Sequence, residues 1–122
     1  MVIQLDNSKG YAGSETALAY ATPYRLSGTC IHIFLDRVLS LDPVSLNHDP
    51  LLANVLLAHV LAHEIAHVLE QSSEHSEEGV MKAHWSPRDI QRMGRHMLPF
   101  MPEDAERIRH GLAVRTASAR RE

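Results

Sequence analysis

Residues 51–71, LLANVLLAHVLAHEIAHVLEQ, are the one apolar stretch of near-membrane length in the chain, and they decide its fold. The stretch contains neither Gly nor Pro and consists of good helix formers, so we expect one long α-helix. Asp49 and Pro50 precede it as an N-cap and a first-turn residue. Because apolar residues fall on nearly every side, the helix should pass through the middle of the domain.

The same stretch carries the motif His63-Glu64-Ile65-Ala66-His67. Side chains four residues apart share one face of a helix, with Cβ atoms about 5–6 Å apart, which suits two nitrogen ligands of one zinc ion. Glu64 is offset by one position and can reach a water bound to the same metal. Unpaired, these polar groups would destabilise an apolar helix by several kcal/mol. We therefore predict zinc held by His63 and His67, with Glu64 as the catalytic base.

A catalytic zinc needs a third protein ligand and leaves its fourth position for water. His75 is the first alternative, since it lies in the polar segment after the helix, from which the chain can turn back. A later helix would instead supply Glu103 or Glu106. His59 lies four residues before His63, but three histidines on one straight helix would be spread over about 12 Å, too far for one ion. We prefer the alternatives in that order.

The segments around this helix predict a mixed α+β fold. A chain of 122 residues has room for one domain, which we place over residues 1–122. Ser86 should cap the first helix after the central one, with Asp89 in a box-like arrangement. The expected elements are strands at 2–5, 17–24 and 29–35 within a strand region 1–40, a loop at 42–50, the active-site helix 51–71, the third ligand and a turn at 75–85, helices at 87–97 and 102–113, and a tail at 114–122.

Composition and charge point to no nucleic-acid or membrane partner. Charged residues make up 22% and hydrophobic residues 44% of the chain, and the formal net charge is -3, as in ordinary globular proteins. The basic cluster at 115–121 is a short end that we expect to be solvated. The apolar stretch carries Asn54, Glu64 and three histidines, which a lipid-facing helix would not tolerate.

The ends and the cysteine content leave the compartment open. Residues 1–6 lack the basic start and the long apolar run of a signal peptide, so no export signal is expected in the chain as given. Cys30 is the only cysteine, which excludes an intramolecular disulfide. We expect it to be a small buried thiol in a strand.

After the helix the chain reads His75-Ser76-Glu77-Glu78-Gly79-Val80-Met81 and continues through Trp85 and Ser86. Together with the two-histidine helix, this run resembles the metzincin clan of zinc peptidases, in its matrixin-like arrangement, and a group of uncharacterised bacterial zincin-like proteins. The resemblance implies His75 as third ligand and Met81 as the methionine of a tight turn beneath the zinc. It also implies a minimal zincin-like catalytic domain, with a small N-terminal sheet packed on the active-site helix and helices after it.

The chain departs from the metzincin pattern in the turn after the helix. That pattern has a Gly three residues after the second histidine and the third ligand three residues later, where this chain has Glu70 and Ser73. His75 comes two residues late. The bacterial group usually has Gly at the position of Gln71, where a left-handed residue ends the helix. Gln71 adopts that conformation only at a steric cost, so the turn must be strained or built differently.

The resemblance also suggests how substrate is held. The Tyr that often follows the Met-turn is replaced by Ala83, which leaves His84 as the candidate stabiliser of the transition state. In metzincins the strand before the active-site helix is the sheet edge that pairs with an extended peptide, and here that strand would contain Ile31, His32 and Ile33.

We therefore expect a zinc-dependent metallopeptidase that hydrolyses peptide or protein substrates by Glu64-assisted attack of zinc-bound water. One alternative is an inactive zinc-binding module, which the small size, the absent Tyr and the missing Gly favour. Another is a zinc hydrolase with a non-peptide substrate, which the ligand set does not exclude. The sequence gives no indication of oligomeric state.

Overall fold

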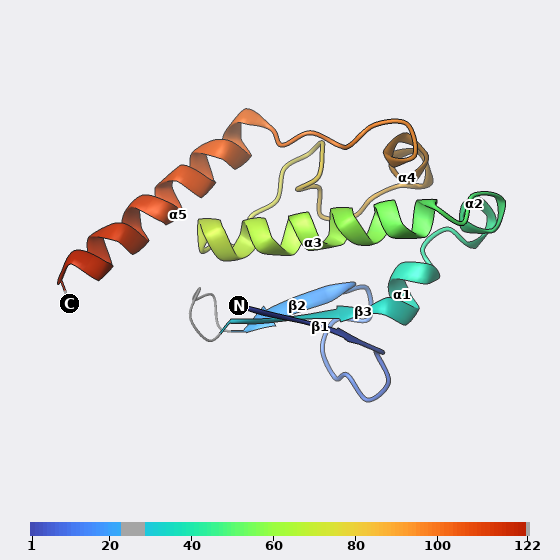
Figure 1. Ribbon diagram of the computed structural model, residues 1–122, viewed down its shortest axis with the longest axis horizontal. Helices are drawn as coiled ribbons and strands as arrows, with labels where there is room; N and C mark the ends of the chain where they lie inside the picture. The colour runs from blue at the N-terminus through green and yellow to red at the C-terminus, as the bar shows by residue number, and fades with distance from the viewer. Residues whose placement is uncertain (23–28, 122) are drawn as a thin grey trace.

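The computed structural model of the chain describes residues 1–22 and 29–121, and their fold is mixed α+β, as predicted (Figure 1). Figure 1 shows α3 between the sheet on one side and α4, α5 and the segment 71–86 on the other. In the described residues the elements are β1 (Val2–Asp6), β2 (Ala19–Thr22), β3 (Cys30–Phe34), α1 (Leu35–Leu39), α2 (Pro43–His48), α3 (Leu52–Glu70), α4 (Pro87–Met93) and α5 (Pro102–Arg121). The predicted strand 17–24 is confirmed over β2, and its last two residues lie outside the described ones.

The sheet has the order β1-β3-β2, with β1 parallel and β2 antiparallel to β3. β3 therefore lies in the middle, and Ile31 and Ile33 are fully buried in the core that the sheet shares with α3. The prediction that Ile31, His32 and Ile33 form a substrate-binding edge is wrong, because β1 and β2 pair with β3 on its two sides. Among the described residues, β2 and β1 form the two edges.

Helix α3 confirms the predicted central element to within one residue at each end. Its apolar residues pack on every side, with Leu56, Val60 and Val68 all at most 2% exposed. The N-cap is Leu51 rather than Asp49, which instead accepts the Leu51 N–H in the preceding turn at 3.2 Å. By length and apolar composition alone, α3 is the one helix among the described residues that could span a membrane.

Two short helices replace the predicted loop at 42–50 and the end of the predicted strand 29–35. Helix α2 begins at Pro43, and Asp42 caps it by accepting the N–H of Ser45. Asp and Pro suit both a loop and a helix start, and here they start a helix. Helix α1 follows β3 directly and buries Val38 completely.

The C-terminal helices also differ from their predicted bounds. The predicted box between Ser86 and Asp89 is confirmed at the start of α4, but α4 ends at Met93 instead of residue 97. Helix α5 continues to Arg121, so the predicted tail 114–122 is helical through 121. Arg115 is not merely solvated, because it donates to the Val68 carbonyl of α3 at 3.0 Å.

Helix α5 crosses the end of α3 at Gly111. A Cβ atom at this position would lie 2.1 Å from the Leu69 carbonyl oxygen and 2.6 Å from Glu70 Cα. Only glycine therefore permits this approach. The contact places Arg107, one turn earlier on α5, against the end of α3 next to Glu70, 3.7 Å away.

Gly111→Ala should destabilise the protein by about 1–3 kcal/mol, because the added methyl group forces α5 away from α3. Helix propensity alone would instead raise the free energy of unfolding, by roughly 0.5–1 kcal/mol, because alanine favours a helix more than glycine does. The free energy of unfolding in urea measures the difference. Ala113→Gly, at an exposed position two residues later, reports the propensity effect alone. A Gly111→Ala variant at least as stable as the wild type would contradict the close contact.

Candidate metal centre

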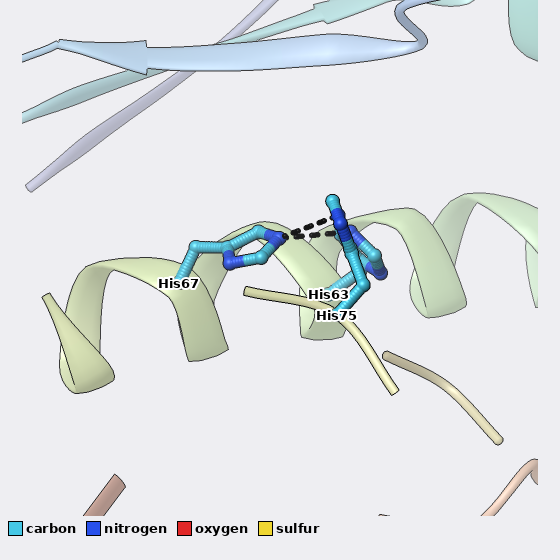
Figure 2. Close-up of side chains that lie close together, drawn as sticks. All are labelled: His63, His67 and His75. Carbon is cyan, nitrogen blue, oxygen red and sulfur yellow. Dashed lines mark hydrogen bonds between the residues drawn. The ribbon is translucent and has the colours of Figure 1, made fainter. Parts of the chain in front are cut away.

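Three histidine side chains converge beside the middle of the molecule. His63 and His67 lie one turn apart on α3, and His75 comes from the segment that follows it (Figure 2). The Nε2 atom of His67 is 3.0 Å from that of His63 and 3.3 Å from that of His75. All three ligand atoms lie within 4.8 Å of one another, and this is the one such cluster among the described residues.

Hydrogen bonds at the Nδ1 atoms fix the orientation of the His63 and His67 rings. The Nδ1 of His63 lies 2.8 Å from the Val80 carbonyl, and that of His67 lies 2.8 Å from the Ser72 carbonyl. A carbonyl only accepts, so each Nδ1 carries the hydrogen and each Nε2 of a neutral ring presents a lone pair. Burial lowers the pKa of His63, and it lowers that of His67 to about 4, so both rings are neutral at pH 7.

Lone pairs that face one another at 3.0 Å repel unless a cation lies between them. Bonds of 2.0–2.1 Å in a tetrahedral site would separate ligand nitrogens by about 3.3–3.4 Å. The two shorter separations here are close to that value. Burial, followed by the charge of His84, lowers the pKa of His75 as well. Three neutral imidazoles of this kind could hold a divalent metal ion such as zinc, copper, iron or nickel.

The other predicted third ligands lie elsewhere. His59 is buried and has both ring nitrogens engaged, Nδ1 with the Val55 carbonyl at 2.8 Å and Nε2 with the Leu98 N–H at 3.0 Å. Glu103 is exposed on α5, and Glu106 pairs with Arg109. The structure thus brings His75 to the pair on α3 and leaves these alternatives outside the cluster.

The turn that delivers His75 ends α3 without glycine. Gln71 has φ 52° and ψ 42°, the left-handed conformation, and is the one non-glycine residue with positive φ in the described chain. That conformation costs an ordinary residue roughly 1–2 kcal/mol. It turns the chain so that the Ser72 carbonyl meets the His67 ring. Of the two predicted alternatives, a strained turn or one built differently, the structure therefore has the left-handed turn.

The segment 76–82 folds beneath the histidines as a tight turn. Met81 is fully buried, and its carbonyl accepts the Ser76 N–H at 2.9 Å. Gly79 has φ 83°, and a Cβ atom there would lie 2.3 Å from the Pro99 oxygen. The neighbouring Val80 carbonyl accepts from His63, so this turn orients a ring of the cluster.

A cavity of about 330 Å³ opens over the histidines. Its lining includes Glu64 and the three rings, together with residues 16–21 and 82–85. Burial raises the pKa of Glu64 to about 7. His84 is exposed in the wall of the cavity, and Trp85 packs edge-on against His63 with ring centroids 5.8 Å apart. The predicted base and the predicted stabiliser therefore face the same space.

Sequence reasoning missed a group of charged residues behind the cluster, formed by Glu70, Asp104 and Arg107. The side chains of Glu70 and Asp104 are completely buried. Burial raises the pKa of Glu70 to about 7, although Arg107 opposes the shift. An acidic residue three positions after His67 on an apolar helix was the available signal, but its partner lies on α5, far along the chain.

Comparison of the chain with protein-family models, with curated proteins and with solved structures gave no match. Function therefore has to be inferred from the histidine cluster and the cavity beside it.

The wild-type protein should bind about one divalent metal ion per chain after exposure to zinc and dialysis. His75→Ala should weaken zinc binding by more than about 100-fold, beyond the loss expected for removal of a mere hydrogen-bond partner of a ligand. Elemental analysis and competition with a chromophoric chelator measure metal content and affinity. His110→Ala, at an exposed position of α5, is the matched control. Equal zinc affinity in wild type and His75→Ala would exclude His75 as a ligand.

Proposed function

We propose that the protein is a zinc-dependent metallopeptidase of the zincin type. The observation that carries the proposal is the shared cavity in which a partly buried Glu64 lies beside three neutral, converging histidines. Three imidazole ligands, an adjacent carboxylate and an open cavity are the parts that metal-assisted hydrolysis requires.

His63, His67 and His75 would hold the metal through Nε2, since each Nδ1 on α3 is engaged with a carbonyl. When bound, zinc supplies a Lewis acid that lowers the pKa of water and polarises a carbonyl group. Glu64 takes up the proton that the attacking water loses and delivers it to the leaving amine. Burial alone raises the pKa of Glu64 to about 7, which makes its carboxylate a better proton acceptor than an ordinary one.

The free edge of β2 supports a peptide as substrate. Residues 19–21 line the cavity, and among the described residues β2 is paired only with β3. An extended peptide can add to such an edge through main-chain hydrogen bonds, which would lay its backbone across the cavity. We therefore assign to β2 the pairing with an extended peptide that was expected of β3.

Two features of the segment 81–84 fit the same proposal. Met81 is buried in the tight turn beneath the histidines, as in the Met-turn that the sequence resembles. Ala83 offers no hydrogen-bonding group, whereas the neighbouring His84 lines the cavity with an imidazole. His84 is therefore our candidate donor to the oxygen that gains negative charge in the transition state.

Glu64→Gln should leave zinc affinity unchanged and lower peptide hydrolysis by about 10²–10⁴-fold, because the amide cannot accept the proton. A fluorogenic peptide library with zinc-loaded, purified protein measures turnover, and elemental analysis confirms loading. Glu106→Gln, which neutralises an exposed carboxylate on α5, should retain full activity.

Retained turnover in zinc-loaded Glu64→Gln would remove Glu64 from the mechanism. A zinc-loaded wild type that cleaves esters or small amides but no peptide would replace the peptidase with a hydrolase of another substrate class. If it hydrolyses nothing and unfolds on chelation, the protein is a zinc-binding module and the proposed activity is wrong.

The pH profile of kcat/KM should show an acid limb with its midpoint no higher than about 7. Glu64 must be ionised to act as a base, and burial alone sets its pKa at about 7. A nearby cation can only lower that value, because it stabilises the carboxylate. Activity should therefore rise as pH increases from 5 and be developed by neutral pH. Initial rates between pH 5 and 9 test this, and an acid limb centred above pH 8 would contradict the assignment.

A further inference from the structure

A second cluster of side chains lies behind the histidines and joins α3 to α5. Glu70, Asp104 and Arg107 form it, and the two carboxylates are completely buried while the arginine is 20% exposed. Buried ionised groups are costly unless each is paired, so such a cluster is retained only where its geometry is well satisfied or where it serves the site. Its contacts lead to His67 and to Ser76, the residue that follows His75.

Glu70 contacts His67 on the side away from the cavity. Its Oε1 lies 3.2 Å from Nδ1 of His67, which also donates to the Ser72 carbonyl. Its Oε2 lies 3.7 Å from Nε of Arg107 and has no hydrogen-bond partner. A carboxylate at the far nitrogen of a ligand imidazole fixes the ring orientation and makes the metal-facing nitrogen more basic.

Asp104 and Arg107 hold the residue that follows His75. The Ser76 hydroxyl donates to Asp104 Oδ1 at 2.5 Å and accepts from Nη2 of Arg107 at 2.9 Å. The same Nη2 donates to Asp104 Oδ1 at 2.7 Å, and the Met101 N–H donates to Oδ2 at 2.6 Å. Arg107 therefore lies beside the carboxylate behind His67 and also donates to the side chain of Ser76, next to His75.

The charges of the cluster do not cancel. When ionised, Glu70 and Asp104 contribute two negative charges and Arg107 one positive charge, which leaves one buried negative charge on the Nδ1 side of His67. A cation on the Nε2 side of the same ring would offset it across the imidazole. Glu74 also approaches Arg107, at 3.7 Å, but it is 70% exposed and screened by water.

We propose that Glu70, Asp104 and Arg107 are positioning residues of the metal centre, with Glu70 orienting His67 and the Arg107–Asp104 pair holding the turn that presents His75. The turn begins at Gln71 without glycine, and α5 supports it through the bonds of Asp104 and Arg107 to Ser76. This inference rests on the proposed metal centre.

The first test is Glu70→Gln, which keeps the shape and one oxygen acceptor but removes the charge. Zinc affinity should fall by about 10–100-fold. In excess chelator, the Tm of the metal-free variant should equal or exceed that of the wild type, because a buried amide is desolvated at lower cost than a carboxylate. A purely structural residue would instead lower the metal-free Tm. Glu106→Gln, the exposed control on α5, should change neither quantity.

The second test is at Arg107. Arg107→Lys restores a positive charge but not the fork of donors, so zinc affinity should lie between that of the wild type and Arg107→Met. Arg109→Met, 71% exposed on the same helix, is the control. If Arg107→Met does not fold, Ser76→Ala removes only the hydroxyl and should weaken zinc binding by about 10-fold, as expected for a lost bond to a charged group.

Wild-type zinc affinity in Glu70→Gln, or in Ser76→Ala together with Arg107→Lys, would overturn this inference and leave the metal centre intact. A wild-type protein that binds no zinc would overturn the metal centre itself, and this inference with it. Loss of affinity in Glu70→Gln with an unchanged metal-free Tm would establish the positioning role.

Discussion

The structure depends on two hydrogen bonds that leave the sides of α3 and end on backbone carbonyls. His63 reaches Val80 and His67 reaches Ser72, each at 2.8 Å. These bonds tie the core helix to the two loops that follow it, and they satisfy polar groups that an apolar helix could not otherwise bury. They also turn both Nε2 atoms toward one point. The same two contacts thus hold the loops against α3 and orient the two rings that face the cavity.

The two sides of α3 have different roles in the fold. The sheet side provides the core through Ile31 and Ile33, and its edge strand β2 borders the cavity. The opposite side provides support, since α5 meets α3 at Gly111 and brings a guanidinium to the back of the histidine cluster. A rigid helix between the two lets a small domain place two of the three converging histidines without relying on its loops.

The central helix and the pairing of His63 with His67 could be predicted because both follow from spacing along one helix. His75 could only be ranked among alternatives, since its approach depends on the left-handed turn at Gln71. The edge strand was assigned wrongly because β3 becomes the middle strand through its parallel pairing with β1, 28 residues earlier in the chain, which leaves no mark in the sequence of β3. The contact between Glu70 and Arg107 likewise depends on how closely two distant helices approach, which only the clearance at Gly111 decides.

Because Gln71 adopts the left-handed conformation, a substitution at this position could make the protein more stable to heat. Asn or Gly would adopt the same backbone angles with less steric conflict, and neither would alter the carbonyl of Ser72 or the path to His75. A substitution at this one position can therefore raise the melting temperature without moving the three converging imidazoles. Thermal stability and the geometry of the histidine cluster can therefore change independently at residue 71.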